Sequence, residues 1–122
     1  EQEIVFVGQV DLGGVFRGKG VLGHEWPYRC RWGVGWPPAN LMLTPFGTLA
    51  DNAFGSRGDV FIVPDPATLT TIRAARDAAP VRLALGHLRT ASGAAWDCCP
   101  RAFLEAALFG AVAGSQLAGD PS

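Results

Sequence analysis

Glycine and proline interrupt this sequence at short intervals, with 16 glycines and nine prolines among its 122 residues. Glycine disfavours regular helices through its backbone freedom, and proline through its missing N–H donor. Long uninterrupted helices are therefore not expected over most of the chain, and short elements joined by turns are. Hydrophobic residues make up 48% of the sequence, which is enough for one core in a single compact domain.

The charge balance and the cysteines limit the partners and the compartment. A net charge of −1 and a pI of about 6.1 argue against nucleic acid or an anionic membrane surface as a partner. No apolar run approaches the roughly 20 residues of a membrane-spanning helix, and no export leader is visible. Cys30, Cys98 and Cys99 are odd in number and two are adjacent, a poor disulfide framework that favours a cytoplasmic location.

Runs of β-branched and aromatic residues predict several strands. Residues 4–10 and 15–22 flank a turn with two glycines, so they predict an antiparallel hairpin. Residues 59–63 predict a buried strand that ends at a proline, and residues 81–88 predict another. Residues 41–43 are a candidate for a short strand.

The clearest predicted helix lies near the C-terminus. Pro100 suits the first helical position. Apolar residues from Phe103 to Val112 then recur at helical spacing. Gly110 or Gly114 can end this helix.

Two segments are ambiguous at this level. Residues 65–79 fit a helix that starts after an aspartate, but their Thr-rich centre fits a strand equally well. The tryptophan-rich residues 23–40 predict a packed loop with one helical turn near residues 28–32. Tryptophans in this loop, from Trp26 to Trp36, are expected to form an apolar patch available for association.

Few motifs in the sequence point to catalysis. Gly18, Gly20 and Gly23 match the G-x-G-x-x-G pattern of dinucleotide sites, but they fall inside a predicted strand rather than before a helix. His24 and His87 have no obvious acid or nucleophile partner, and no metal-ligand spacing occurs. The residues therefore supply no complete catalytic set of nucleophile, base and charge stabiliser.

Three stretches, taken in order, resemble the N-terminal domain of the glutamine synthetase family. The first resembles the family's opening hairpin, the second its glycine loop and buried strand, and the third its Cys-Pro-Arg segment. These stretches are residues 9–21, 55–69 and 93–104. The resemblance is nearer to the divergent glutamate–amine ligase branches than to the main ammonia-assimilating enzymes.

The resemblance implies an α+β, β-grasp-like domain over residues 1–114. Its sheet would be mostly antiparallel or mixed, with about five strands and a C-terminal helix. Residues 115–122 would be a tail or the start of a linker to an absent catalytic domain. For the ambiguous segment, the resemblance favours a turn at residues 66–69 and a strand near 70–74.

The resemblance also implies the chemistry of a longer parent protein. In the family, ATP phosphorylates glutamate, and ammonia or an amine then displaces the phosphate to form an amide. ATP and Mg²⁺ or Mn²⁺ are bound by a C-terminal catalytic domain, so no cofactor is expected in this fragment. The expected partners are that domain, of the same or a neighbouring subunit, within a homo-oligomer.

One loop is the candidate for a functional site. In the family, a loop before the buried strand covers a neighbouring subunit's active site, and the corresponding residues here include Asp51, Asn52, Phe54 and Arg57. A carboxylate such as Asp51 would attract a cationic amine, and Phe54 would exclude water. The family's ammonia-using members carry aspartate, glycine and serines in this loop, and no residue here matches them cleanly. The same residues also fit a loop that merely makes turns.

Two other functions remain open from the sequence. The chain could be a stand-alone β-grasp interaction module without catalytic activity. It could also be a small enzyme that uses Cys98 or Cys99, although neither has an evident base partner.

Overall fold

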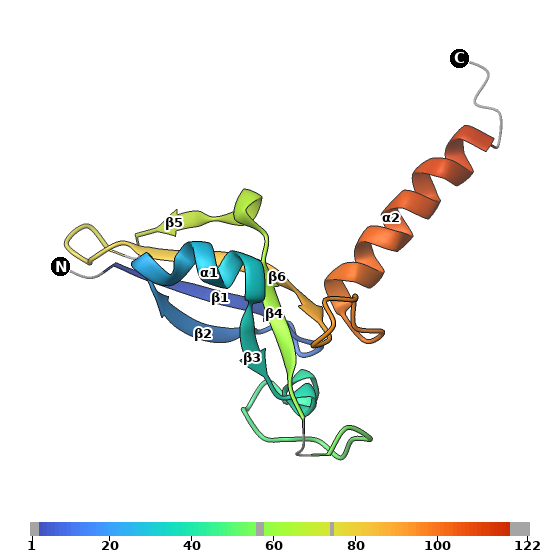
Figure 1. The fold of residues 1–122 in the computed structure, drawn as a ribbon, viewed down its shortest axis with the longest axis horizontal. Helices are drawn as coiled ribbons and strands as arrows, with labels where there is room; N and C mark the ends of the chain where they lie inside the picture. The colour runs from blue at the N-terminus through green and yellow to red at the C-terminus, as the bar shows by residue number, and fades with distance from the viewer. Residues whose placement is uncertain (1–2, 56–57, 74, 118–122) are drawn as a thin grey trace.

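The computed structural model describes residues 3–55, 58–73 and 75–117 (Figure 1). In this described part, strands of one sheet are β1 (Ile4–Val10), β2 (Phe16–Leu22), β3 (Val34–Trp36), β4 (Val60–Pro64), β5 (Thr70–Ile72) and β6 (Val81–Arg89). The α-helices are α1 (Trp26–Trp32) and α2 (Pro100–Leu117). The short 3₁₀ helices are η1 (Gly23–Glu25), η2 (Pro38–Met42) and η3 (Pro66–Thr68).

The sheet is mixed, with the strand order β2-β1-β6-β4-β3 and β5 also paired to β6. β1 runs parallel to β6, and the other pairs are antiparallel. β4 and β5 both pair with the edge of β6 opposite β1, each with a different half of that strand. The predicted β-grasp-like α+β fold is confirmed, with six strands in the described residues where about five were expected.

The predicted hairpin is confirmed as β1 and β2, in a register that places Gly8 opposite Gly18. A Cβ on Gly18 would collide with the backbone carbonyl of Val7, so glycine permits the close approach of the two strands. Gly18 and Gly20 of the G-x-G-x-x-G match therefore lie within a strand, where no helix N-terminus can receive a pyrophosphate.

The core lies on the face of the sheet that α1 crosses (Figure 1). Its buried residues are Val5, Val7, Val21, Val34, Trp36, Val60, Ile62, Leu88 and Cys99. Trp26, Leu69, Trp96 and Ala102 pack against this cluster. On β1 the alternation of buried and exposed residues leaves Ile4, Phe6 and Val10 on the opposite, open face.

The predicted apolar patch from Trp26 to Trp36 is wrong at both ends. Trp36 is 7% exposed within β3, and Trp26 packs against the core. Residues 23–40 form η1, α1, β3 and the first part of η2 rather than an irregular loop, and Val34 and Trp36 pair with residues of β4. Only the predicted helical turn near residues 28–32 is confirmed, as the larger part of α1.

Within residues 65–79, which fitted either a helix or a strand, the described residues form the turn and strand that the family resemblance implied and not an α-helix. The Asp65 carboxylate accepts a hydrogen bond from the Ala67 N–H (3.0 Å) and so begins η3. Thr68 Oγ1 then accepts from the Leu85 N–H (2.9 Å), which joins η3 to β6. The chain continues as β5, confirming the predicted turn and strand up to Ile72; residue 74 lies outside the described residues.

Several predictions of element type or bounds are wrong: β2 begins at Phe16 rather than at residue 15, and β6 ends at Arg89 rather than at residue 88. Residues 41–43 are mostly the end of η2, and only Leu43 makes a bridge, to Leu49. β4 begins at Val60, one residue later than predicted. α2 continues through Gly110 and Gly114 to Leu117, because neither glycine has the positive φ of a helix terminator.

Gly33 provides a stability test of the α1–β3 junction. It ends α1 with φ 75° and ψ −171°, and a Cβ there would lie 2.7 Å from the Ile62 carbonyl oxygen. We expect Gly33→Ala to lower the free energy of unfolding by about 3 kcal/mol, measured by urea unfolding. Gly47→Ala is the matched control, since Gly47 shares the positive φ but has open space around it. Equal losses in the two variants would contradict the predicted clash.

Candidate functional site

The candidate loop begins with a small hairpin between η2 and β4. The Thr44 N–H donates to the Thr48 carbonyl (2.8 Å), and the Gly47 N–H donates to the Thr44 carbonyl (2.9 Å). Pro45 before Phe46 and a positive φ at Gly47 suit such a tight turn. The hairpin tip presents Phe46 to solvent, where its side chain is 93% exposed.

Three of the four predicted site residues lie among the described residues, and each of the three has a different environment. Asp51 is exposed. Asn52 makes a local turn, donating to the Ala50 carbonyl and accepting from the Phe54 N–H, both at 2.9 Å. Phe54 packs on Trp96, with ring centroids 5.3 Å apart and planes at 57°. Arg57 lies outside the described residues.

An ion pair between Asp11 and Arg17, which was not predicted from the sequence, contacts the first residues of this loop. The side chain of Asp11 is 1% exposed, and its Oδ2 accepts from Arg17 Nε at 2.6 Å. Its Oδ1 accepts from the N–H groups of Gly13 (2.9 Å) and Val15 (3.0 Å). Arg17 Nη2 also donates to the Thr44 carbonyl (3.0 Å), so the pair connects the β1–β2 turn to the base of the loop.

The groups around Asp11 lower the pKa of its carboxyl group. Desolvation by burial acts to raise the pKa of Asp11, but the hydrogen bonds from Val15, Arg17 and Gly13 outweigh it and hold the pKa below its ordinary value. The only signal in the sequence was an aspartate at the end of a strand, six residues before an arginine.

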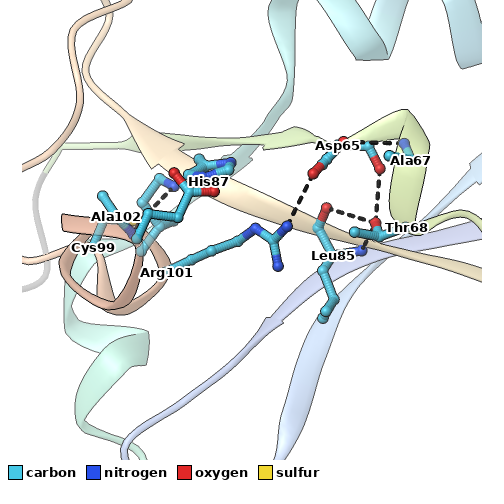
Figure 2. Close-up of polar contacts among 10 residues, drawn as sticks. Asp65, Ala67, Thr68, Leu85, His87, Cys99, Arg101 and Ala102 are labelled. Atoms are coloured by element: carbon cyan, nitrogen blue, oxygen red, sulfur yellow. Dashed lines mark hydrogen bonds and ion pairs between the residues drawn. The ribbon is translucent and has the colours of Figure 1, made fainter. Parts of the chain in front are cut away.

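The first turn of α2 is fastened to the sheet by side-chain contacts (Figure 2). Cys99 caps the helix, because its Sγ accepts from the N–H groups of Ala102 (3.4 Å) and of Leu88 in β6 (3.2 Å). Arg101 Nη2 donates to Asp65 Oδ2 at 2.9 Å, and His87 Nε2 lies 2.9 Å from Glu105 Oε1. Beyond these contacts α2 extends away from the sheet (Figure 1).

Apolar side chains remain uncovered on two surfaces. The first, called here the α2 surface, is 56–78% exposed and comprises Phe103, Leu104, Leu108, Phe109 and Val112. The second, the open sheet face, is 37–49% exposed and comprises Ile4, Phe6, Val10, Leu22, Ile72 and Val81. Large apolar side chains exposed in groups of this kind mark interaction sites.

The family model of the glutamine synthetase N-terminal domain matches residues 2–96. The chain belongs to this family. The resemblance to the family is confirmed, and the match contains the first two motif stretches and the first residues of the third. No curated protein matches this glutamine synthetase N-terminal domain.

Solved structures of glutamine synthetase homologues have the same fold. Each of them is longer than this domain. A crystal structure described as a novel glutamine synthase homolog matches with 30% identity and a TM-score of 0.79, over 87% of this chain and 26% of that chain. GmaS with ADP matches with 21% identity and a TM-score of 0.70, over 92% of this chain and 23% of GmaS. GmaS without ligand matches with 21% identity and a TM-score of 0.58, over 81% and 21%. The GmaS likenesses support the fold alone, and the domain spans about a quarter of these chains.

The described residues of this glutamine synthetase N-terminal domain offer few groups for redox or metal chemistry. Within residues 3–55, 58–73 and 75–117, no group of three histidine, cysteine or acidic side chains could hold a metal ion. No helix in that part is long and apolar enough to cross a membrane.

The three thiols are free and differ in exposure. Cys99 is buried, Cys30 is half-buried and Cys98 is exposed. Burial raises the pKa of the Cys30 thiol, which lowers its reactivity. Among the described residues, no hydrogen bond joins the Cys98 thiol to a basic side chain. The structure therefore adds nothing to the hypothesis of a cysteine enzyme.

Proposed function

We propose that this chain is the N-terminal domain of an ATP-dependent ligase that joins glutamate to ammonia or an amine, and that it is inactive alone. The observation that carries the proposal is the family match over residues 2–96, together with a longer homologue in which the matched part accounts for 26% of the chain. The GmaS complex with ADP supports a nucleotide-dependent reaction for a parent of this fold. The free thiols suit a cytoplasmic location, and a role in nitrogen metabolism follows from the proposed reaction.

The described residues do not fit the Mg²⁺ or Mn²⁺ that the family implies beside ATP. Divalent cations of this kind need several oxygen ligands in one place, and the described residues supply no such cluster. In the proposed function, other residues of the parent bind ATP and the metal ions, and this domain contributes surfaces and a loop.

The proposed partner is the C-terminal catalytic domain of the same or a neighbouring subunit in a homo-oligomer. The α2 surface and the open sheet face support this partner, because both leave large apolar side chains without cover in the described part of the chain. α2 extends from the sheet toward the C-terminal end, where a following domain would begin (Figure 1). We propose residues 1–114 as the domain and residues 115–122 as the start of the connection.

The loop of Asp51, Asn52, Phe54 and Arg57 is proposed to cover a neighbouring active site. The contact of Phe54 with Trp96 would hold the loop in place. The loop would then shield the reacting groups from water. The turn at Asn52 would hold Asp51 outward, so that its carboxylate could attract a cationic amine.

A substitution in the full-length parent tests the loop. Asp51→Asn is expected to raise KM for the amine about tenfold with little change in kcat, because a charge-assisted contact to the substrate is lost. The matched control is Asp77→Asn, since Asp77 is also exposed but lies in the β5–β6 connection. An unchanged KM for the amine would assign the loop a purely structural role.

The competing proposal is a stand-alone β-grasp interaction module. It is favoured by the same uncovered apolar surfaces, which would then bind an unrelated partner. The coding sequence after Ser122 distinguishes the two: a following domain with clustered glutamates and an arginine-rich phosphate site supports the ligase, and a stop codon supports the module.

A further inference from the structure

A groove lies where the pairing of β1 with β6 ends and α2 begins. Its volume is about 320 Å³, within the range of small-molecule sites. Gln9, Asp11 and Arg101 supply its polar groups, and Val10, Leu85 and Leu104 supply apolar walls. The groove involves none of the candidate loop residues, and nothing in the proposed function uses it.

Gln9 is an unusual residue for its position. It follows Val5 and Val7 on the core-facing side of β1 and is 4% exposed. In the described part of the chain, no side-chain hydrogen bond involves its amide, although it lines the groove. Neither amide atom of Gln9 is among the fully buried side-chain atoms without a partner, so solvent in the groove reaches the amide. A polar ligand there would replace this water as its hydrogen-bond partner.

Arg101 brings unused donors to the same groove. Its Nη2 is held by Asp65 at 2.9 Å, and Figure 2 shows the side chain reaching from the start of α2 toward Asp65 and Leu85. Its Nε is buried and has no hydrogen-bond partner. Because α2 begins at Pro100, beside this side chain, the helix dipole adds positive potential there.

The negative charge of Asp11 does not cancel the positive potential that Arg101 and the start of α2 create in the groove. Its carboxylate already accepts hydrogen bonds from Gly13, Val15 and Arg17, and Arg17 balances its charge. The groove therefore offers donors from Arg101 and an amide from Gln9 but no free carboxylate, which selects an anion and disfavours a cation.

We propose that this groove binds a small organic carboxylate. The carboxylate group would accept from the remaining donors of Arg101 and from the amide of Gln9, and a short hydrocarbon chain would lie against Val10, Leu85 and Leu104. An amino acid should bind more weakly than the corresponding simple acid, because its ammonium group would find no free carboxylate in the groove.

Butyrate is a suitable probe, and the side-chain amide of Gln9 reports on it directly. In ¹H–¹⁵N correlation spectra of the ¹⁵N-labelled chain, butyrate is expected to shift the Gln9 side-chain signals and the Arg101 Nε–H signal to saturation. Butylamine, and sodium chloride at matched ionic strength, should leave them in place. Saturation by inorganic phosphate but not by butyrate would overturn the assignment to a carboxylate, and so would the absence of saturable shifts with butyrate.

Variants separate this site from a structural role of the same residues. Gln9→Met and Arg101→Lys are each expected to weaken butyrate binding about tenfold or more. Gln9→Met should leave the unfolding temperature of the ligand-free chain unchanged, since no hydrogen bond of the fold is lost. Arg76→Lys is the control for Arg101→Lys, because Arg76 is exposed and distant in the β5–β6 connection. Wild-type affinity in Gln9→Met would overturn the proposal.

Discussion

Replacing Asp11 with alanine is expected to lower the free energy of unfolding by about 3 kcal/mol, a large part of the stability of a domain this size. The substitution removes the acceptor for the Gly13 and Val15 N–H groups and leaves the Arg17 guanidinium without its carboxylate. Because Arg17 is 22% exposed, water can partly compensate, which places the loss at the lower end for a broken buried pair. Urea unfolding at neutral pH measures it, with Asp77→Ala as an exposed control.

The same residue predicts a pH dependence. The folded-state pKa of Asp11 is lowered, while the unfolded value is about 3.9. The stabilisation from ionised Asp11 is therefore fully present above the unfolded pKa and is lost as pH falls through the folded pKa. The stability difference between wild type and Asp11→Asn should be constant near neutral pH and shrink below about pH 4. A difference that is absent at neutral pH, or that grows in acid, would contradict this account.

Removing apolar side chains from the α2 surface is expected to weaken self-association of the isolated chain. Leu108 and Val112 are each 58% exposed, so a second copy can bury them at high concentration. Each buried side chain contributes about 1.5 kcal/mol or more, so Leu108→Ser with Val112→Ser should raise the dissociation constant about a hundredfold. Sedimentation equilibrium measures the change.

A matched pair of substitutions controls for the polarity of serine. Ala106→Ser with Ala111→Ser adds the same hydroxyl groups to exposed positions but removes little apolar area. This control should associate like wild type. Because these side chains are already exposed, the unfolding free energies of the variants should differ from wild type only by the lower helix propensity of serine, about 0.5 kcal/mol per substitution. A wild-type chain that stays monomeric at every concentration would show that the α2 surface alone does not drive association.

The elements predicted correctly from sequence are those whose pattern is local. The β1–β2 hairpin has two apolar runs around a glycine turn, and β4 is an apolar run ended by Pro64. β3 was missed because it has only three residues and exists through its pairing with β4. The burial of Trp36 follows from that pairing, so no local pattern could separate it from the exposed Trp32.

Boundaries and side-chain partnerships were harder to predict, for physical reasons. A glycine costs a helix only about 1 kcal/mol, so α2 continues through Gly110 and Gly114. The pairing of Asp11 with Arg17 depends on the turn between them, which periodicity does not describe. The sequence predicted a loop before β4, but not the contact of Phe54 with Trp96, 42 residues later in the chain.

Glutamate-dependent ATP turnover in the presence of an amine tests the central claim most directly. It should be measured for this chain alone and for the full-length parent under identical conditions. The account predicts turnover by the full-length protein and none above background by the isolated chain. Turnover by the isolated chain, lost when its own residues are substituted, would contradict the claim that the reactive groups lie outside this domain.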